Sequence, residues 1–173
     1  MPNIEIATTT GRKLVLNAKA IEQLDTGLRG GHLLRGDDEY DAARKIYNAM
    51  IDHRPEIIAR CAGATDVISA VNFARNNGLL VSVRGGGHNV SGNAVCDGGL
   101  MIDLSPMKTV RVDPQGKTVR AEAGVTWGEF DREKQAFGLA TTGGLVSTTG
   151  IAGQRWAAAL AGSWETTGLP ATI

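Results

Sequence analysis

The sequence is poor in the features that mark disulfide-rich, membrane-spanning and nucleic-acid-binding proteins. It has two cysteines in 173 residues, too few for a disulfide scaffold and without the Cys/His spacing of a metal site. No apolar run approaches the ~18 residues of a membrane span, and residues 1–10 lack a signal-peptide pattern. Lys+Arg and Asp+Glu both number 18, which disfavours nucleic-acid and anionic-membrane partners. We therefore expect a cytoplasmic protein that binds no metal and has no nucleic-acid or membrane partner.

Catalytic motifs are also missing. The chain shows no Ser-His-Asp order and no paired-carboxylate site, so we assign no catalytic residue. His32 and His53 have no distinctive surroundings in the sequence, and we expect both on the surface. Nothing close to Cys96 in the sequence would lower its pKa, so we interpret it as a buried packing residue rather than a reactive thiol.

Glycine, by contrast, is abundant. It makes up 23 of the 173 residues, against a usual share of roughly 7%. Fourteen of the 23 lie between Gly85 and Gly153. Glycine concentrated in this way indicates backbone that turns sharply or approaches a ligand closely.

The first half of the chain predicts alternating helices and strands. Residues 26–36 contain four glycines and are expected to be a loop, and the apolar spacing over 37–52 predicts a helix. Strands over 57–62 and 79–84 flank a predicted helix over 65–77, which Gly78 ends. This order is that of a βαβ unit with parallel strands.

The second half adds mainly antiparallel elements. A buried strand is predicted over 100–104, and period-two segments over 109–112 and 118–123 predict a hairpin. The sequence from Thr126 to Glu129 is a capping box that opens a helix to about residue 137. A short strand is predicted over 139–142. The mixture indicates an α+β fold.

Two glycine-rich loops are the candidate binding segments. The first, Arg84–Gly92, follows a predicted strand, and its successive glycines expose backbone N–H groups that can surround an anion. It leads into another strand and lacks the GxGxxG spacing, so it is neither a Rossmann fingerprint nor a P-loop. The second loop, Gly143–Gly153, combines glycines with hydroxyl side chains. Together they suit opposite sides of one diphosphate; the alternative is two unrelated turns.

His88 lies inside the first loop and has several possible roles. An exposed polar residue without function is the simplest interpretation. The alternatives are a hydrogen-bond donor to phosphate, a general base, or a nucleophile that becomes bonded to a cofactor.

Longer segments strengthen the functional interpretation. The segments VSVRGGGHNVSGNAVCDGGLMIDLSPMKTVRVD, RAEAGVTWGEFD and FGLATTGGLVSTTGIAG resemble the FAD-binding domain of the p-cresol methylhydroxylase/vanillyl-alcohol oxidase superfamily. Within it, they are most similar to the berberine-bridge-enzyme-like FAD-linked oxidases. The resemblance covers about residues 33–153 and implies the N-terminal portion of such a domain, in which two α+β subdomains hold FAD.

The resemblance also implies roles for individual residues. It implies that His88 forms an 8α bond to the flavin. Plant-type members of the family have a second linkage, through a cysteine of the second loop. The matching position here is Val146, so no second covalent bond is expected. The implied cofactor-binding residues are otherwise Arg84, Gly85, Gly86, Gly87, Asn89, Ser91 and Gly92 in the first loop, and Gly143, Ser147, Thr148, Gly150 and Gly153 in the second.

The resemblance stops after Gly153, where relatives continue with a leucine and a Gly-Gly-Gly segment. Suitable codons for residues 154–173, shifted by one nucleotide, permit that segment, so we expect a change of reading frame there. The expected organisation is an N-terminal extension with one helix (1–52), a partial FAD-binding domain (53–153) and an out-of-frame tail (154–173).

Three functions remain open from the sequence. The first is the N-terminal part of an FAD-dependent oxidoreductase that passes hydride from a small-molecule substrate to flavin, with O₂ as acceptor. The second is a truncated, non-catalytic fragment with weak or no flavin binding. The third is an unrelated nucleotide-binding α/β domain. The substrate and the oligomeric state are not assigned.

Overall fold

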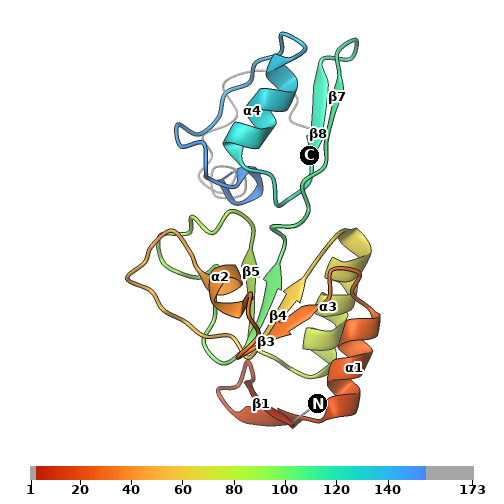
Figure 1. Ribbon diagram of the computed structural model, residues 1–173, viewed down its shortest axis with the longest axis vertical. Coiled ribbons are helices and arrows are strands. Elements are labelled where there is room, and N and C mark those ends of the chain that lie inside the picture. Colours follow the sequence, from red (N-terminus) through yellow and green to blue (C-terminus); the bar gives the residue numbers. More distant parts are fainter. Residues whose placement is uncertain (1–2, 155–173) are drawn as a thin grey trace.

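Three parallel strands that end at one edge of a sheet organise the larger of two lobes (Figure 1). The structure is a computed structural model, and it describes residues 3–154. The sheet has the order β3-β4-β6-β5. Strands β4 (Ile57–Arg60), β6 (Leu100–Asp103) and β5 (Val81–Arg84) are parallel, and β3 (His32–Leu34) is antiparallel to β4.

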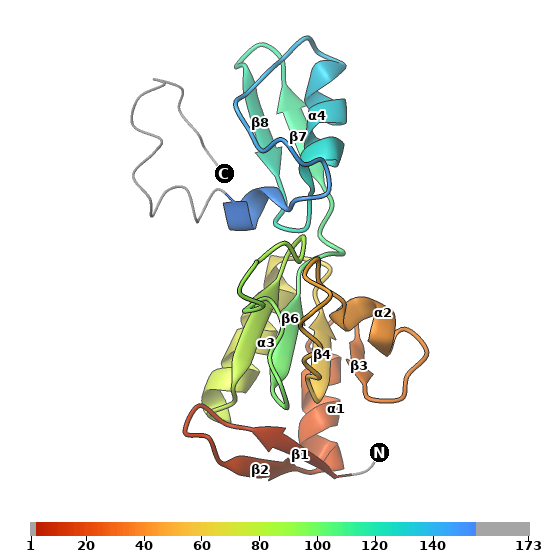
Figure 2. The same ribbon diagram turned by 90° about the vertical axis from the view of Figure 1, so that its left-hand side faces the viewer.

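Helices cover both faces of this sheet (Figure 2). Alternate residues of β4 and β6 enter different clusters, as expected for strands buried on both sides. One face packs against α1 (Ala18–Thr26) and α3 (Ala64–Asn76), and the other against α2 (Tyr40–Arg44) and the segment that follows it. The central strand β6 is buried along its whole length. Sheet and helices thus hold the carboxyl ends of the parallel strands in fixed positions.

An antiparallel hairpin closes the base of the larger lobe, at the end opposite the smaller lobe (Figure 2). It comprises β1 (Ile4–Ala7) and β2 (Lys13–Leu16). Ile6 and Leu16 are buried in the same cluster as Ile21 and Leu24 of α1. The N-terminal residues therefore share the core of the larger lobe.

The smaller lobe is a hairpin with one helix. Strands β7 (Val110–Asp113) and β8 (Thr118–Ala121) pair antiparallel, and α4 (Trp127–Gln135) packs on them. The Glu129 carboxylate accepts a hydrogen bond of 2.8 Å from the backbone N–H of Thr126, as the predicted capping box requires. The Trp127 ring is buried in the centre of this lobe.

Most predicted elements are confirmed. The two parallel strands that flank α3, the strand over 100–103, the hairpin and α4 all form. Gly78 follows α3 with φ of +61°, the left-handed conformation expected of a glycine after a helix. One detail of the βαβ unit was not foreseen: β6 lies between β4 and β5, so those two strands do not pair.

The helix predicted over 37–52 was wrong in length. Helix α2 ends at Arg44, because Lys45 takes an extended conformation with ψ of 137°. The residues that follow are held by the first glycine loop: the Tyr47 N–H donates to Gly87 O at 2.9 Å. A tertiary contact therefore replaces the helical hydrogen bonds that the apolar spacing favours.

Other local predictions also fail. Residues 26–36 are not all loop, since β3 lies within them and pairs with β4. Residues 139–142 form no strand; the Leu139 N–H bonds back to Lys134 O, and the chain then runs irregularly into the second loop. The N-terminal 52 residues contain two helices rather than one. The His32 side chain is only 8% exposed and bonds to Asp25, whereas His53 is exposed as predicted.

Some predictions fall beyond the described part of the chain. The expected out-of-frame tail, 154–173, lies outside the described residues except for Gln154. Within residues 3–154, no helix is long and apolar enough to cross a membrane, and no group of three or more His, Cys, Asp or Glu side chains is placed to hold a metal ion.

Candidate cofactor site

An ion-paired cluster fixes the point where the first glycine loop leaves the sheet. Arg60, Asp103 and Arg84 are the last residues of β4, β6 and β5, and the strand register aligns them. The Asp103 carboxylate is buried and accepts from Arg84 Nη1 at 3.1 Å and from Ser105 Oγ at 2.9 Å. Because a buried charge is stable only when paired, this cluster holds the strand ends together.

The first loop turns immediately after Arg84. Gly87 and Gly92 have φ values of +70° and +79°, which side chains other than glycine rarely adopt. Between them, the Asn89 side chain accepts a hydrogen bond of 2.9 Å from the Asn93 N–H. A Cβ on Gly92 would lie 2.4 Å from Ile51 Cδ1, so the loop packs tightly on the segment after α2.

The second loop touches the first, backbone against backbone. A Cβ on Gly86 would lie 2.3 Å from Gly150 N, and a Cβ on Gly150 would lie 2.5 Å from Gly86 N. The second loop is itself held by the smaller lobe, since the Ile151 N–H donates to Val125 O. Two segments about sixty residues apart in sequence therefore meet at a pair of glycines.

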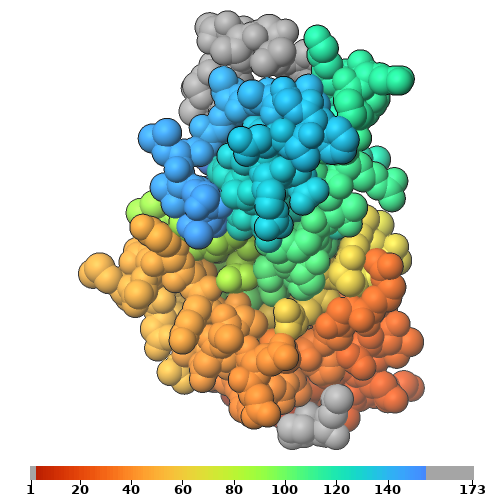
Figure 3. All heavy atoms as spheres, turned by 45° about the horizontal axis from the view of Figure 1, so that its top comes forward, coloured from red at the N-terminus to blue at the C-terminus, as the bar shows by residue number. Residues whose placement is uncertain are grey.

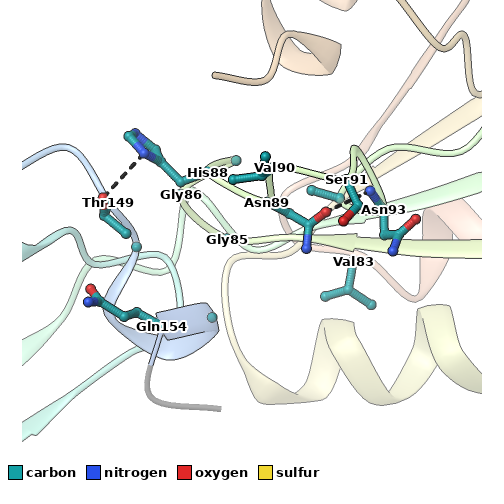
Figure 4. A pocket seen from close by; sticks show the side chains of 14 residues that line it. Val83, Gly85, Gly86, His88, Asn89, Val90, Ser91, Asn93, Thr149 and Gln154 are labelled. Carbon is teal, nitrogen blue, oxygen red and sulfur yellow. Dashed lines mark hydrogen bonds between the residues drawn. The ribbon is translucent and has the colours of Figure 1, made fainter. Parts of the chain in front are cut away.

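A cavity of about 520 Å³ opens beside this contact (Figure 4). The residues that line it come from β5, both loops and the residues after them: Val83, Gly85, Gly86, Gly87, His88, Asn89, Val90, Ser91, Asn93, Ala94, Thr149, Gly150, Gly153 and Gln154. None of these side chains carries a carboxylate, ammonium or guanidinium group. Among the described residues, an anion here would find backbone N–H groups and polar side chains, as in other glycine-rich anion sites.

The imidazole of His88 is held on three sides. Its Nδ1 lies 3.2 Å from the Thr149 hydroxyl and its Nε2 lies 3.1 Å from the Thr148 hydroxyl, both within hydrogen-bond distance. Its face stacks on the Tyr47 ring, with centroids 4.2 Å apart. Figure 4 shows the side chain extended from the first loop toward the second. The imidazole thus bridges the two loops.

The structure gathers eight of the predicted site residues around the cavity: Gly85, Gly86, Gly87, His88, Asn89, Ser91, Gly150 and Gly153. Thr148 lies next to them and contacts His88. Arg84 does not line the cavity, since its guanidinium binds Asp103 and the Lys45 carbonyl. Gly92 faces Ile51.

Two residues of the second loop serve its packing on α4. A Cβ on Gly143 would lie 2.4 Å from the Trp127 ring. The Ser147 carbonyl accepts from the Gly128 N–H at 2.8 Å. Neither residue lines the cavity.

Sequence reasoning missed several contributors. Asn93, Thr149 and Gln154 line the cavity, and Tyr47 covers the face of His88. Thr149 lies between two predicted residues, so the loop pattern could have included it. Tyr47 carries no such signal, because the apolar spacing assigned it to a helix.

The two cysteines are buried thiols and do not line the cavity. Burial raises the pKa of Cys61 to about 12, and burial likewise raises the pKa of Cys96 above its ordinary value. Both therefore remain protonated at neutral pH, which agrees with the packing role predicted for Cys96.

A glycine-lined cavity between two α+β lobes is of the kind that accommodates an anion, and the comparisons with known proteins define the class of protein. Residues 55–167 match the family model described as "FAD binding domain". The chain belongs to this family, and its relatives are FAD-linked oxidoreductases of the p-cresol methylhydroxylase and berberine-bridge-like type.

Individual relatives support this assignment. The chain is 38% identical over 126 residues to (R)-6-hydroxynicotine oxidase of Paenarthrobacter nicotinovorans, covering 73% of this chain and 28% of that protein. The structure of 6-hydroxy-D-nicotine oxidase from Arthrobacter nicotinovorans aligns with a TM-score of 0.70 at 38% identity, over 72% of this chain and 27% of the other. The BBE-like 1 structure from Physcomitrella patens aligns with a TM-score of 0.71 at 26% identity, and the alignment covers 78% of this chain and 30% of the other.

The chain therefore spans little more than a quarter of the length of the relatives it matches. It is similar to the N-terminal FAD-binding part of those oxidoreductases, and the expected family and fold class are confirmed.

Proposed function

We propose that the cavity between the two glycine loops binds the diphosphate of FAD. The observation that carries this proposal is the contact of Gly86 with Gly150, where a Cβ on either residue would collide with the other backbone. A contact this close brings N–H groups of both loops to one cavity without a side chain between them. Gly85, Gly87 and Ser91 extend the lining on one side, and Gly153 extends it on the other.

We further propose that His88 carries the flavin through an 8α bond. His88 lines the cavity and contacts the second loop, where its two ring nitrogens meet hydroxyls that can each donate or accept. Bond formation joins one ring nitrogen to the 8α carbon, with loss of one C–H bond and of the imidazole N–H bond. Dioxygen would take up the two electrons and two protons released and become hydrogen peroxide.

For the whole protein, we propose an FAD-linked oxidase acting on a small molecule. When bound, FAD would supply the redox chemistry, taking hydride from the substrate and passing two electrons to O₂, while this chain's residues would bind and orient it. The relatives named as nicotine oxidases favour a small organic substrate. The proposed location is the cytoplasm, where the two buried thiols would stay reduced.

A second candidate is supported by the length of the match. Because the chain spans about 28% of the first relative, we propose as the alternative that these residues alone bind flavin weakly or not at all and have no catalytic activity. The division into residues 1–52, 53–153 and an out-of-frame 154–173 stays a proposal. DNA sequencing across the Gly153 codon tests the change of reading frame.

Acid precipitation tests whether flavin is covalently bound to His88. The purified chain is incubated with FAD in air, precipitated with acid, and its pellet assayed for flavin fluorescence. We expect retained flavin in the wild type and none in His88→Ala. The matched control is His53→Ala, which removes an exposed imidazole and should keep the wild-type amount. Flavin retained by His88→Ala would contradict the linkage, and no FAD binding by the wild type would favour the second candidate.

A further inference from the structure

Residues 45–48, which we call the brace, lie alongside the first glycine loop. Arg84 Nε donates to Lys45 O at 3.3 Å, and the Tyr47 N–H donates to Gly87 O at 2.9 Å. Asn48 Nδ2 then donates to Val90 O at 3.1 Å. These bonds reach the loop on both sides of His88. The space-filling view shows the orange segment that includes the brace near the blue second loop, with atoms of the first loop between them (Figure 3).

The brace places one aromatic ring directly on His88. The Tyr47 ring stacks on the imidazole with an interplanar angle of 20° and a centroid separation of 4.2 Å. Tyr47 is 70% exposed, so burial in the core does not explain its position. Among the described residues, the Tyr47 hydroxyl makes no hydrogen bond, and the contact is therefore one of ring against ring.

We propose that Tyr47 is a positioning residue for His88. An exposed imidazole turns about two single bonds and visits several rotamers. A ring stacked on its face removes those rotations but leaves the edge free, and the lone pair that attacks carbon lies in the plane of the ring. Tyr47 therefore orients the nitrogens of His88 while Thr148 and Thr149 contact them from the second loop.

The consequence for flavin attachment rests on the proposed function of His88. Reactions between bound groups depend steeply on alignment, and a displacement of about 1 Å can lower a rate by about a hundredfold. Loss of the Tyr47 ring is expected to slow attachment about tenfold or more. Non-covalent FAD affinity should change less than about twofold, because Tyr47 does not line the cavity.

The first test needs no flavin. In the NMR spectrum of the FAD-free chain, ring current from Tyr47 should shift the His88 ring protons upfield of those of exposed His53, and nuclear Overhauser effects should join the two rings. Tyr47→Phe should keep the upfield shift because it keeps the ring. Tyr47→Leu should move the His88 signals toward those of His53. Absence of the shift and of the Overhauser effects in the wild type would overturn the proposal, even if Tyr47→Leu failed to fold.

The second test measures the rate of covalent flavin incorporation. Tyr47→Phe is expected to attach flavin at a rate within about twofold of wild type, and Tyr47→Leu about tenfold more slowly. Tyr47→Leu reacting at the wild-type rate would overturn the role in attachment while leaving the proposed function intact. A wild type that attaches no flavin would refute the linkage at His88, and the NMR measurement would still decide whether Tyr47 positions the imidazole.

Discussion

At the scale of the residue, buried polar groups fasten the framework on which the site stands. Asp66, near the start of α3, is 1% exposed. Its carboxylate accepts from the backbone N–H groups of Ala62 and Gly30 and from Arg29 Nε. Burial favours the protonated form, but these hydrogen bonds outweigh it and hold the pKa of Asp66 below its ordinary value. The carboxylate joins the end of β4 to the loop before β3.

This arrangement predicts the effect of substituting Asp66. Asp66→Asn removes the charge that strengthens three hydrogen bonds, so the free energy of unfolding should fall by about 2 kcal/mol. Urea denaturation at pH 7 measures it. The control is Asp38→Asn, an exposed position, which should stay within about 0.5 kcal/mol of wild type. Equal stability of Asp66→Asn and wild type would contradict the account.

The same residue predicts a dependence on pH. Because the folded pKa of Asp66 is lowered, its contribution is fully present above the unfolded pKa of about 3.9. It is lost as the pH falls through the folded pKa. The stability difference between wild type and Asp66→Asn should therefore shrink on acidification below about pH 4. If the stability difference grew as the pH fell, the pKa of Asp66 would be raised in the folded protein, which would contradict the account.

At the scale of the element, local sequence patterns were sufficient to predict a helix or strand whose partners are near in sequence. The β7–β8 hairpin, the capping box of α4 and Gly78 after α3 follow from short-range chemistry. The pattern over 37–52 failed because the first glycine loop, forty residues away, takes the hydrogen bonds of the brace. His32 was misassigned for a different reason: its partner Asp25 is only seven residues away, but it belongs to a helix that the sequence did not reveal.

The contact between the loops gives a prediction at the same scale. Gly86→Ala or Gly150→Ala places a methyl group within 2.5 Å of backbone nitrogen in the other loop. The loops must separate, and overpacking of this kind costs about 1–3 kcal/mol, so FAD affinity should fall about ten- to a hundredfold. Fluorescence titration with FAD measures the loss.

A surface variant provides the comparison for those two substitutions. Lys19→Ala lies on the exposed face of α1, in the larger lobe and outside the cavity lining. It should bind FAD as the wild type does. If Gly86→Ala and Gly150→Ala also bound FAD with wild-type affinity, the close approach of the loops would not matter for the site.

At the scale of the whole molecule, the proposed cofactor site depends on how two lobes meet. The larger lobe supplies the strand ends, the first loop and the brace, while the smaller lobe holds the second loop through Val125. The glycine pattern predicted both loops and His88, and the family resemblance predicted their common ligand. Neither identified Tyr47, because a contact between distant segments leaves no periodic signal in one sequence, and Thr149 was left out although the loop pattern could have included it.

Amide hydrogen exchange with and without FAD tests the central claim most directly. The claim is that both glycine loops bind one FAD molecule, so FAD should slow exchange in residues 85–88 and in residues 149–153 together. Exchange in the β1–β2 hairpin, at the far end of the larger lobe (Figure 2), should not change. Protection of only one loop, or of neither while FAD is bound elsewhere, would contradict the account.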